Sequence, residues 1–157
     1  MIMKKLFMTL LFICATITSV SAQNIYNEVK RIEKQAETLA NDTTKNLNER
    51  KIACFKYDAI YYLIDKASQE DNFTEYELGE QTDALIEFVN LYVKRLAEAN
   101  KKDKELLKAK FRTASINNSL FNDVDKEVVY SYVDNENFIT QFSLDTNWVK
   151  ALEEVKK

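Results

Sequence analysis

Residues 74–99 read TEYELGEQTDALIEFVNLYVKRLAEA and predict an amphipathic helix. Thr74 followed three residues later by Glu77 is the pattern of a capping box, in which each side chain accepts a hydrogen bond from the backbone N–H of the other residue. Apolar residues then recur at helical spacing, which places them on one face. These residues are Leu78, Leu85, Ile86, Phe88, Val89, Tyr92, Val93 and Leu96. We expect this face to pack against other helices of a common core.

The rest of the chain carries further helix signals. Its 157 residues include one glycine and no proline, whereas tight turns and sheets normally need more of both. Apolar residues from Ile25 to Leu39 form one seam along a first helix. A second capping-box pattern, Asn46 with Glu49, opens a helix that extends to about Ser68. The apolar arc of this second helix is wide, which predicts neighbours on several of its sides.

Two more helices are expected towards the C-terminus. A polar link at residues 101–104 precedes a helix with Phe111 on its apolar stripe. A short last helix begins with Asp145 as its N-cap and contains Trp148. The fold predicted from these patterns is an all-α, single-domain helical bundle of about five helices over residues 23–157.

The segment from Asp123 to Val133 has two interpretations. A helix capped by an aspartate would direct its valines inward, whereas a strand would pair with residues 138–144 across the polar turn at 134–137. We prefer the helix, because an isolated hairpin needs a surface to pack on and the rest of the chain is helical. A C-terminal β-hairpin packed on the bundle is the minor alternative.

The first 22 residues have the pattern of a cleaved signal peptide. Lys4 and Lys5 supply the positive start, residues 6–13 begin the apolar core, and residues 19–22, SVSA, form a small-residue cleavage site. Polar residues from Thr16 onward interrupt the apolar run before it reaches the roughly 20 residues of a spanning helix. We therefore expect an exported protein, periplasmic or extracellular, with no stable membrane span after cleavage.

The composition excludes several classes of site. With no histidine, and with Cys54 as the one cysteine after the signal, the usual zinc, copper and haem sites and the Ser-His-Asp triad cannot be assembled. Gly79 is the single glycine, so phosphate-binding glycine loops are missing as well. We expect no metal and no cofactor. Cys54 is expected at the edge of the core, with an intermolecular disulfide as the alternative.

The charge balance bears on the partners. The formal net charge is −3, and removal of the two signal lysines makes the exported part more acidic. A nucleic-acid binder normally carries a basic excess on one face. We therefore expect no nucleic-acid partner.

The function predicted from these features is that of a non-catalytic binding or interaction module in the cell envelope, with a protein or a glycan as its partner. One candidate surface is an aromatic cluster, because rings with a polar tip suit sugars and protein partners. The cluster comprises Tyr130, Tyr132, Phe138, Phe142 and Trp148. Burial of these rings in the core is the competing interpretation. Tyr57, Asp58 and Tyr61 are the other candidate ligand-binding residues, and no residue is assigned as catalytic.

A carboxylate-based hydrolase acting on glycans is the alternative function. Such an enzyme needs two acids about 5 to 10 Å apart in a cleft. Asp58 and Asp65 are two helical turns apart on one face and offer that spacing. A small bundle seldom provides a deep substrate cleft, so the enzyme is the less favoured hypothesis.

Three phrases of the sequence resemble a family of small exported α-helical proteins from gut-type Gram-negative bacteria. They are FKYDAIYYL at 55–63, SLFNDVDK at 119–126 and QFSLDTNW at 141–148. The resemblance spans most of the exported chain and implies export and an all-α fold. That family has no assigned activity, so it implies no functional residues. The tripeptide at 42–44 also resembles an O-glycosylation acceptor of some of these bacteria, with Thr43 as the modified residue.

Overall fold

The computed structural model describes residues 22–123, 128–129 and 141–157. Within these ranges five α-helices form one bundle, together with a pair of two-residue strands, which confirms the predicted all-α fold. The helices are α2 (Ala22–Asn41), α3 (Leu47–Ala67), α4 (Glu75–Glu98), α5 (Lys101–Asn117) and α6 (Trp148–Lys156), and the strands are β1 (Val128–Val129) and β2 (Phe142–Ser143). None of the described helices is long and apolar enough to span a membrane.

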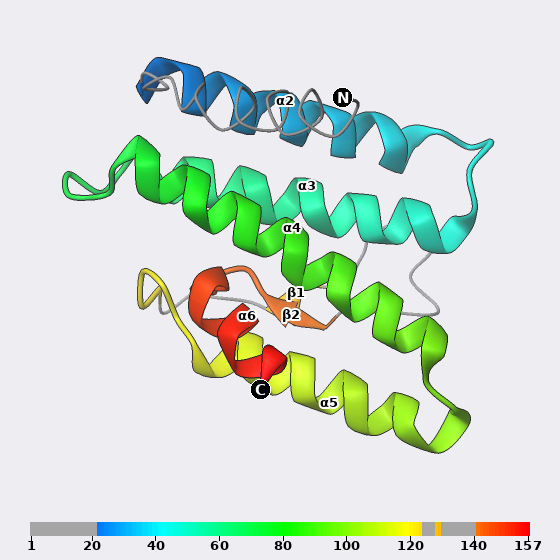
Figure 1. The fold of residues 1–157 in the computed structure, drawn as a ribbon. Coiled ribbons are helices and arrows are strands. Elements are labelled where there is room, and N and C mark those ends of the chain that lie inside the picture. Colours follow the sequence, from blue (N-terminus) through cyan, green and yellow to red (C-terminus); the bar gives the residue numbers. More distant parts are fainter. Residues whose placement is uncertain (1–21, 124–127, 130–140) are drawn as a thin grey trace, which may run out of the picture.

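Helix α4 lies at the centre of the arrangement (Figure 1). On one side it packs against α2 and α3, which lie side by side. On the other side it packs against α5 and α6, and α5 also contacts β2. This agrees with the sequence of α4, whose apolar face gives Leu85, Phe88 and Val89 to the core without exposed surface.

The predicted capping box of α4 is present, whereas α3 has the predicted N-cap, Asn46, without the bond from Glu49 that would complete a box. At the start of α4, the backbone N–H of Glu77 donates to Thr74 Oγ1 at 3.2 Å, and the backbone N–H of Thr74 donates to Glu77 Oε2 at 2.7 Å. At the start of α3, Asn46 accepts a hydrogen bond from the backbone N–H of Asn48 at 2.8 Å. These caps satisfy backbone donors that a helix N-terminus otherwise leaves without a partner.

Gly79 allows α2 to approach the first turns of α4. A Cβ atom added at this position would lie 2.9 Å from Cγ2 of Ile25 in α2. That distance is too short for two carbon atoms in van der Waals contact. The single glycine of the chain therefore has a packing role inside a helix, where glycine is otherwise unfavourable.

Aromatic rings fill the core between α3, α4, α5 and α6. The ring of Phe88 has edge contacts with Phe111, Phe142 and Trp148, at centroid distances of 5.0, 5.3 and 5.4 Å. The ring of Phe55 packs against Phe142 in the same way at 5.4 Å. Such edge-to-face pairs add to the stabilisation that burial itself provides.

The helix predicted for residues 123–133 is wrong at Val128 and Val129, which form strand β1. Val128 lies opposite Ser143, and Val129 lies opposite Phe142, in an antiparallel pair. β-branched valines favour this extended conformation, and β2 supplies the packed partner that an isolated hairpin lacks. Residues 124–127 and 130–140 lie outside the described ranges.

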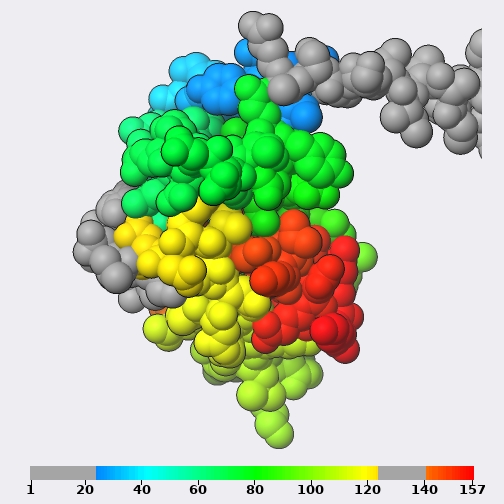
Figure 2. Space-filling model, turned by 90° about the vertical axis from the view of Figure 1, so that its left-hand side faces the viewer, coloured from blue at the N-terminus to red at the C-terminus, as the bar shows by residue number. Residues whose placement is uncertain are grey.

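The last helix begins later than predicted, and Asp145 is not its N-cap. Asn147 caps α6 by accepting a hydrogen bond from the backbone N–H of Lys150 at 3.1 Å. Asp145 is fully buried, and its carboxylate accepts hydrogen bonds from the loop that follows α5. Figure 2 shows this loop, in yellow, against the C-terminal segment, in orange and red.

Candidate functional site

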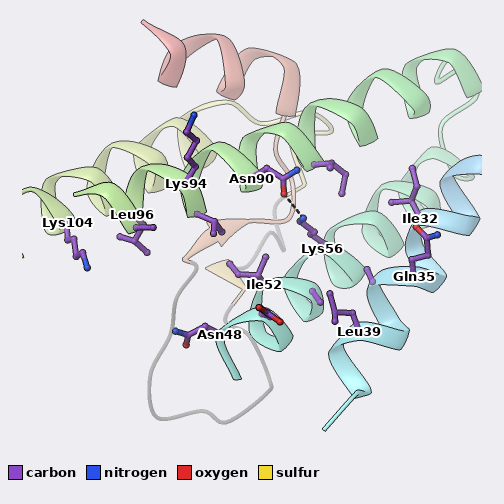
Figure 3. Close-up of a pocket in the computed structure, with 16 residues that line it drawn as sticks. Ile32, Gln35, Leu39, Asn48, Ile52, Lys56, Asn90, Lys94, Leu96 and Lys104 are labelled. Carbon is purple, nitrogen blue, oxygen red and sulfur yellow. Dashed lines mark hydrogen bonds between the residues drawn. The ribbon is translucent and has the colours of Figure 1, made fainter. Parts of the chain in front are cut away.

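A groove between α2, α3 and α4 has a volume of about 790 Å³ (Figure 3). This volume falls within the range of about 300–1,000 Å³ that is typical of small-molecule sites. Most of its lining is apolar. The apolar lining residues are Ile32, Ala36, Leu39, Ile52, Ala53, Ile86, Val93, Leu96 and Ala97.

Small side chains on facing helices leave this space open. Ala36 on α2 and Ala53 on α3 are buried, and each contributes one methyl group to the lining. Larger side chains beside them remain partly in solvent: Leu39 is 36% exposed and Val93 is 40% exposed. Exposed apolar side chains that gather in a concavity mark a binding surface more often than isolated ones do.

Three lysines and one glutamate supply the charges of the groove. Lys56, Lys94 and Lys104 come from α3, α4 and α5, and Glu49 comes from the first turn of α3. The groove is therefore positive, although the chain as a whole carries a net charge of −3. A positive, mostly apolar concavity in an acidic protein favours ligands of negative charge.

Lys56 is a charged groove residue that is hydrogen-bonded to a neighbouring helix. Its Nζ atom donates a hydrogen bond to Oδ1 of Asn90 on α4 at 2.8 Å, which Figure 3 shows as a dashed line. Burial lowers the pKa of the Lys56 ammonium group, because the apolar surroundings disfavour its charge. No carboxylate of the described residues forms an ion pair with Lys56.

The structure brings Tyr57 and Tyr61 together, one turn apart on α3. Their ring centroids lie 6.3 Å apart, and Tyr61 is 54% exposed. Burial raises the pKa of Tyr57, and the charges of Glu37 and Glu33 on α2 raise it further. Neither tyrosine lines the groove, so this pair lies on another side of α3 from Lys56.

Asp58 also lies outside the groove. It accepts a hydrogen bond from the thiol of Cys54, with 3.8 Å between Sγ and Oδ2. Burial raises the pKa of Asp58 to about 6, and the hydrogen bond from the Cys54 thiol partly opposes this increase. Asp65, the second acid of the hydrolase hypothesis, is exposed and accepts a hydrogen bond from Gln69. Cys54 itself is half-buried.

Trp148 lies in the core and not on the surface, as the competing interpretation of the aromatic cluster expects. Its side chain is 0% exposed and packs against the rings of Phe55 and Phe88. Phe142 is buried beside it. As the first residue of α6, Trp148 fastens this short helix to α3 and α4. The other members of the aromatic cluster, at 130, 132 and 138, lie outside the described residues.

Sequence reasoning did not identify Lys56 or Asn90. A lysine on an amphipathic helix is usually a solvent-facing residue. The available signal was its position, one turn after Ile52 and Ala53 on the same apolar side of the helix. Asn90 likewise interrupts an apolar face between Ile86 and Val93.

Comparisons with known proteins returned no relative of this chain. No family model matches the sequence, and neither a curated protein nor a solved structure matches it significantly. Within the described ranges, no group of three acidic or cysteine side chains is arranged to hold a metal ion. Arguments about function therefore rest on the groove and its residues.

Proposed function

We propose that this chain is an exported, non-catalytic binding protein of the cell envelope, and that the groove between α2, α3 and α4 is its ligand site. The observation that supports the proposal is the combination of volume and lining. A space of about 790 Å³ is bordered by nine apolar and seven polar or charged side chains. Ligand sites in proteins usually combine an apolar surface with a small number of placed polar groups.

The lining favours a ligand with a hydrocarbon portion over a glycan. Sugar sites commonly use the flat faces of aromatic rings, and the residues that line this groove include none. The aliphatic side chains of Leu39, Ile52 and Val93 suit a hydrocarbon. The partner class expected from the sequence, a protein or a glycan, is thereby narrowed in this proposal to a ligand with a hydrocarbon portion.

The lining also favours binding over hydrolysis. Glycoside hydrolysis uses two carboxylic acids that flank the substrate. Among the groove residues Glu49 is the single acid, and Asp58, whose raised pKa would suit a general acid, lies elsewhere on α3. The carboxylate hydrolase therefore remains the less favoured hypothesis.

Binding of a neutral, environment-sensitive dye such as Nile red tests the proposed site. We expect saturable fluorescence enhancement with the wild-type protein. The double variant Leu39→Gln, Val93→Gln should weaken binding at least tenfold, because it places polar amides on the apolar walls. Leu106→Gln is the matched control, since Leu106 is 67% exposed and lies outside the groove. Equal weakening in the control, or no saturable binding, would contradict the proposal.

Export has its own test. Cells that express the full chain should contain the protein in the envelope or the medium, and its N-terminal residue should be Gln23. Full-length protein retained in the cytosol would refute this part of the proposal.

A further inference from the structure

We propose that the ligand of the groove is a single-chain fatty acid, whose carboxylate binds beside the Lys56–Asn90 pair while its hydrocarbon chain lies along the apolar lining. This inference rests on the proposed function, because it assumes that the groove binds a ligand. It adds the identity of the head group and the residues that recognise it.

Lys56 is a partly desolvated cation, and no carboxylate among the described residues forms an ion pair with it. Five lysines of the described residues form ion pairs, for example Lys30 with Glu33 at 2.9 Å and Lys66 with Asp123 at 2.6 Å. Lys56 instead has the neutral amide oxygen of Asn90 as its hydrogen-bond acceptor. Taking a charge out of water is costly unless it is paired, so an anion beside Lys56 would recover part of that cost.

The orientation of Asn90 provides a second donor for the same anion. An ammonium group can only donate hydrogen bonds, so the oxygen of the Asn90 amide must face Lys56. The NH₂ group of Asn90 is the other branch of the same amide, and no described residue accepts a hydrogen bond from it. A carboxylate beside the pair would accept from Lys56 Nζ with one oxygen and from this NH₂ group with the other, and such charge-assisted bonds are the stronger kind.

The surroundings favour a single chain with one negative charge. Lys94 and Lys104 also line the groove and add positive potential, but they come from α4 and α5, whereas Lys56 comes from α3. The groove contains no arginine, the side chain that binds phosphate through two parallel hydrogen bonds. A carboxylate on a hydrocarbon chain matches one ammonium group, one amide and an aliphatic lining.

The test compares two probes that share a chain and differ in the head group, hexadecanoic acid and hexadecanol. Their affinities for the protein, purified from cells that express the full chain, are measured by displacement of the bound dye below the micellar concentration. We expect the acid to bind at least tenfold more tightly than the alcohol. Lys56→Gln should remove this preference, whereas Lys101→Gln, an exposed lysine outside the groove, should leave it unchanged.

Asn90→Asp is a second variant that keeps the side-chain shape. Its carboxylate would pair with Lys56 and compete with the ligand, so the affinity for the acid should fall to that for the alcohol, with alcohol binding unchanged. This outcome does not depend on whether Lys56→Gln folds well.

The outcomes separate the two proposals. Equal affinity for acid and alcohol, with both reduced by Leu39→Gln, Val93→Gln, would overturn the fatty-acid inference and leave the groove as a site. Binding of neither probe, together with no dye binding, would overturn both. Displacement of the dye by an acidic amphipathic peptide and not by the acid would overturn the inference in favour of a protein partner.

Discussion

The carboxylate of Asp145 accepts a hydrogen bond from the backbone N–H of Phe121 at 2.7 Å, which joins residues 24 positions apart in the sequence. The same carboxylate accepts from the backbone N–H groups of Leu120 at 3.0 Å and Asp123 at 2.9 Å, and from the hydroxyl of Ser119. A fully buried charge thus has four donors. It holds the loop after α5 against the segment that leads into α6.

Asp145→Asn should lower the free energy of unfolding by about 2–4 kcal/mol. Each hydrogen bond to a charged group contributes about 1.5–3 kcal/mol, and the new NH₂ group would face backbone donors. Urea denaturation of both proteins measures the difference. Asp71→Asn is the control, since Asp71 is exposed. A loss below about 0.5 kcal/mol, the usual effect of a surface substitution, would show that the loop is not held by this charge.

Tyr62→Phe tests the connection of the same loop to α3. The hydroxyl of Tyr62 donates to Oδ2 of Asp123 at 3.0 Å, and Lys66 forms an ion pair with the same oxygen atom. Burial and the bond to Asp123 both raise the pKa of Tyr62, so the hydroxyl keeps its proton and acts as a donor. Phenylalanine retains the ring contact with Phe121, so we expect a loss of about 1 kcal/mol in thermal or urea unfolding.

The control for this prediction is Tyr61→Phe. Tyr61 is 54% exposed, so removal of its hydroxyl should change the stability by less than about 0.5 kcal/mol. If Tyr62→Phe has no larger effect than Tyr61→Phe, the hydroxyl of Tyr62 does not fasten the loop.

The starts of α3 and α4 could be predicted because their signals are local. The hydrogen bonds between Thr74 and Glu77 join residues three positions apart. The side chain of Asn46 accepts from the backbone N–H two positions later. Helical spacing likewise places Phe88 and Tyr92 on one face whatever surrounds the helix. Such features depend on backbone geometry that a short stretch of chain determines.

The features that could not be predicted depend on distant partners. Asp145 and Asn147 are both good N-cap residues, and Asp145 lost that role because donors at 119–123 surround its carboxylate. Val128 and Val129 form a strand because Phe142 is packed on the bundle beside them. The groove around Lys56 needs alanines from two helices, and their relative placement is a property of the packed bundle.

Gly79→Ala should destabilise the protein by about 1 kcal/mol, even though alanine is the better helix former. The gain in helix propensity is about 1 kcal/mol, and overpacking a filled space costs about 1–3 kcal/mol. The added methyl group would meet Cγ2 of Ile25 at 2.9 Å. In the Ile25→Ala background that atom is gone, so the same substitution should then stabilise the protein. An equal effect of Gly79→Ala in both backgrounds would show that Ile25 does not limit this position.

Asp58 should make the protein less stable as the pH rises from 4 to 7. Its pKa is about 6 in the folded protein, above the value of 3.8 for an ordinary aspartate, because burial disfavours the charge. The folded state therefore binds more protons than the unfolded state between these values, and stability decreases as the pH increases through this window. The side chain is half-exposed, so water screens the charge and the effect is smaller than the full shift implies.

Asp58→Asn removes this ionisation while it keeps the side-chain size. We expect the variant to have a higher Tm than the wild type at pH 7, a similar Tm at pH 4, and a weaker dependence on pH between them. Thermal unfolding from pH 4 to pH 8 measures the effect, with Asp65→Asn as the exposed control on the same helix. Parallel curves for the wild type and Asp58→Asn would mean that Asp58 ionises in the folded protein at its ordinary pKa, and that the apolar surroundings of α3 at this position do not retain its proton.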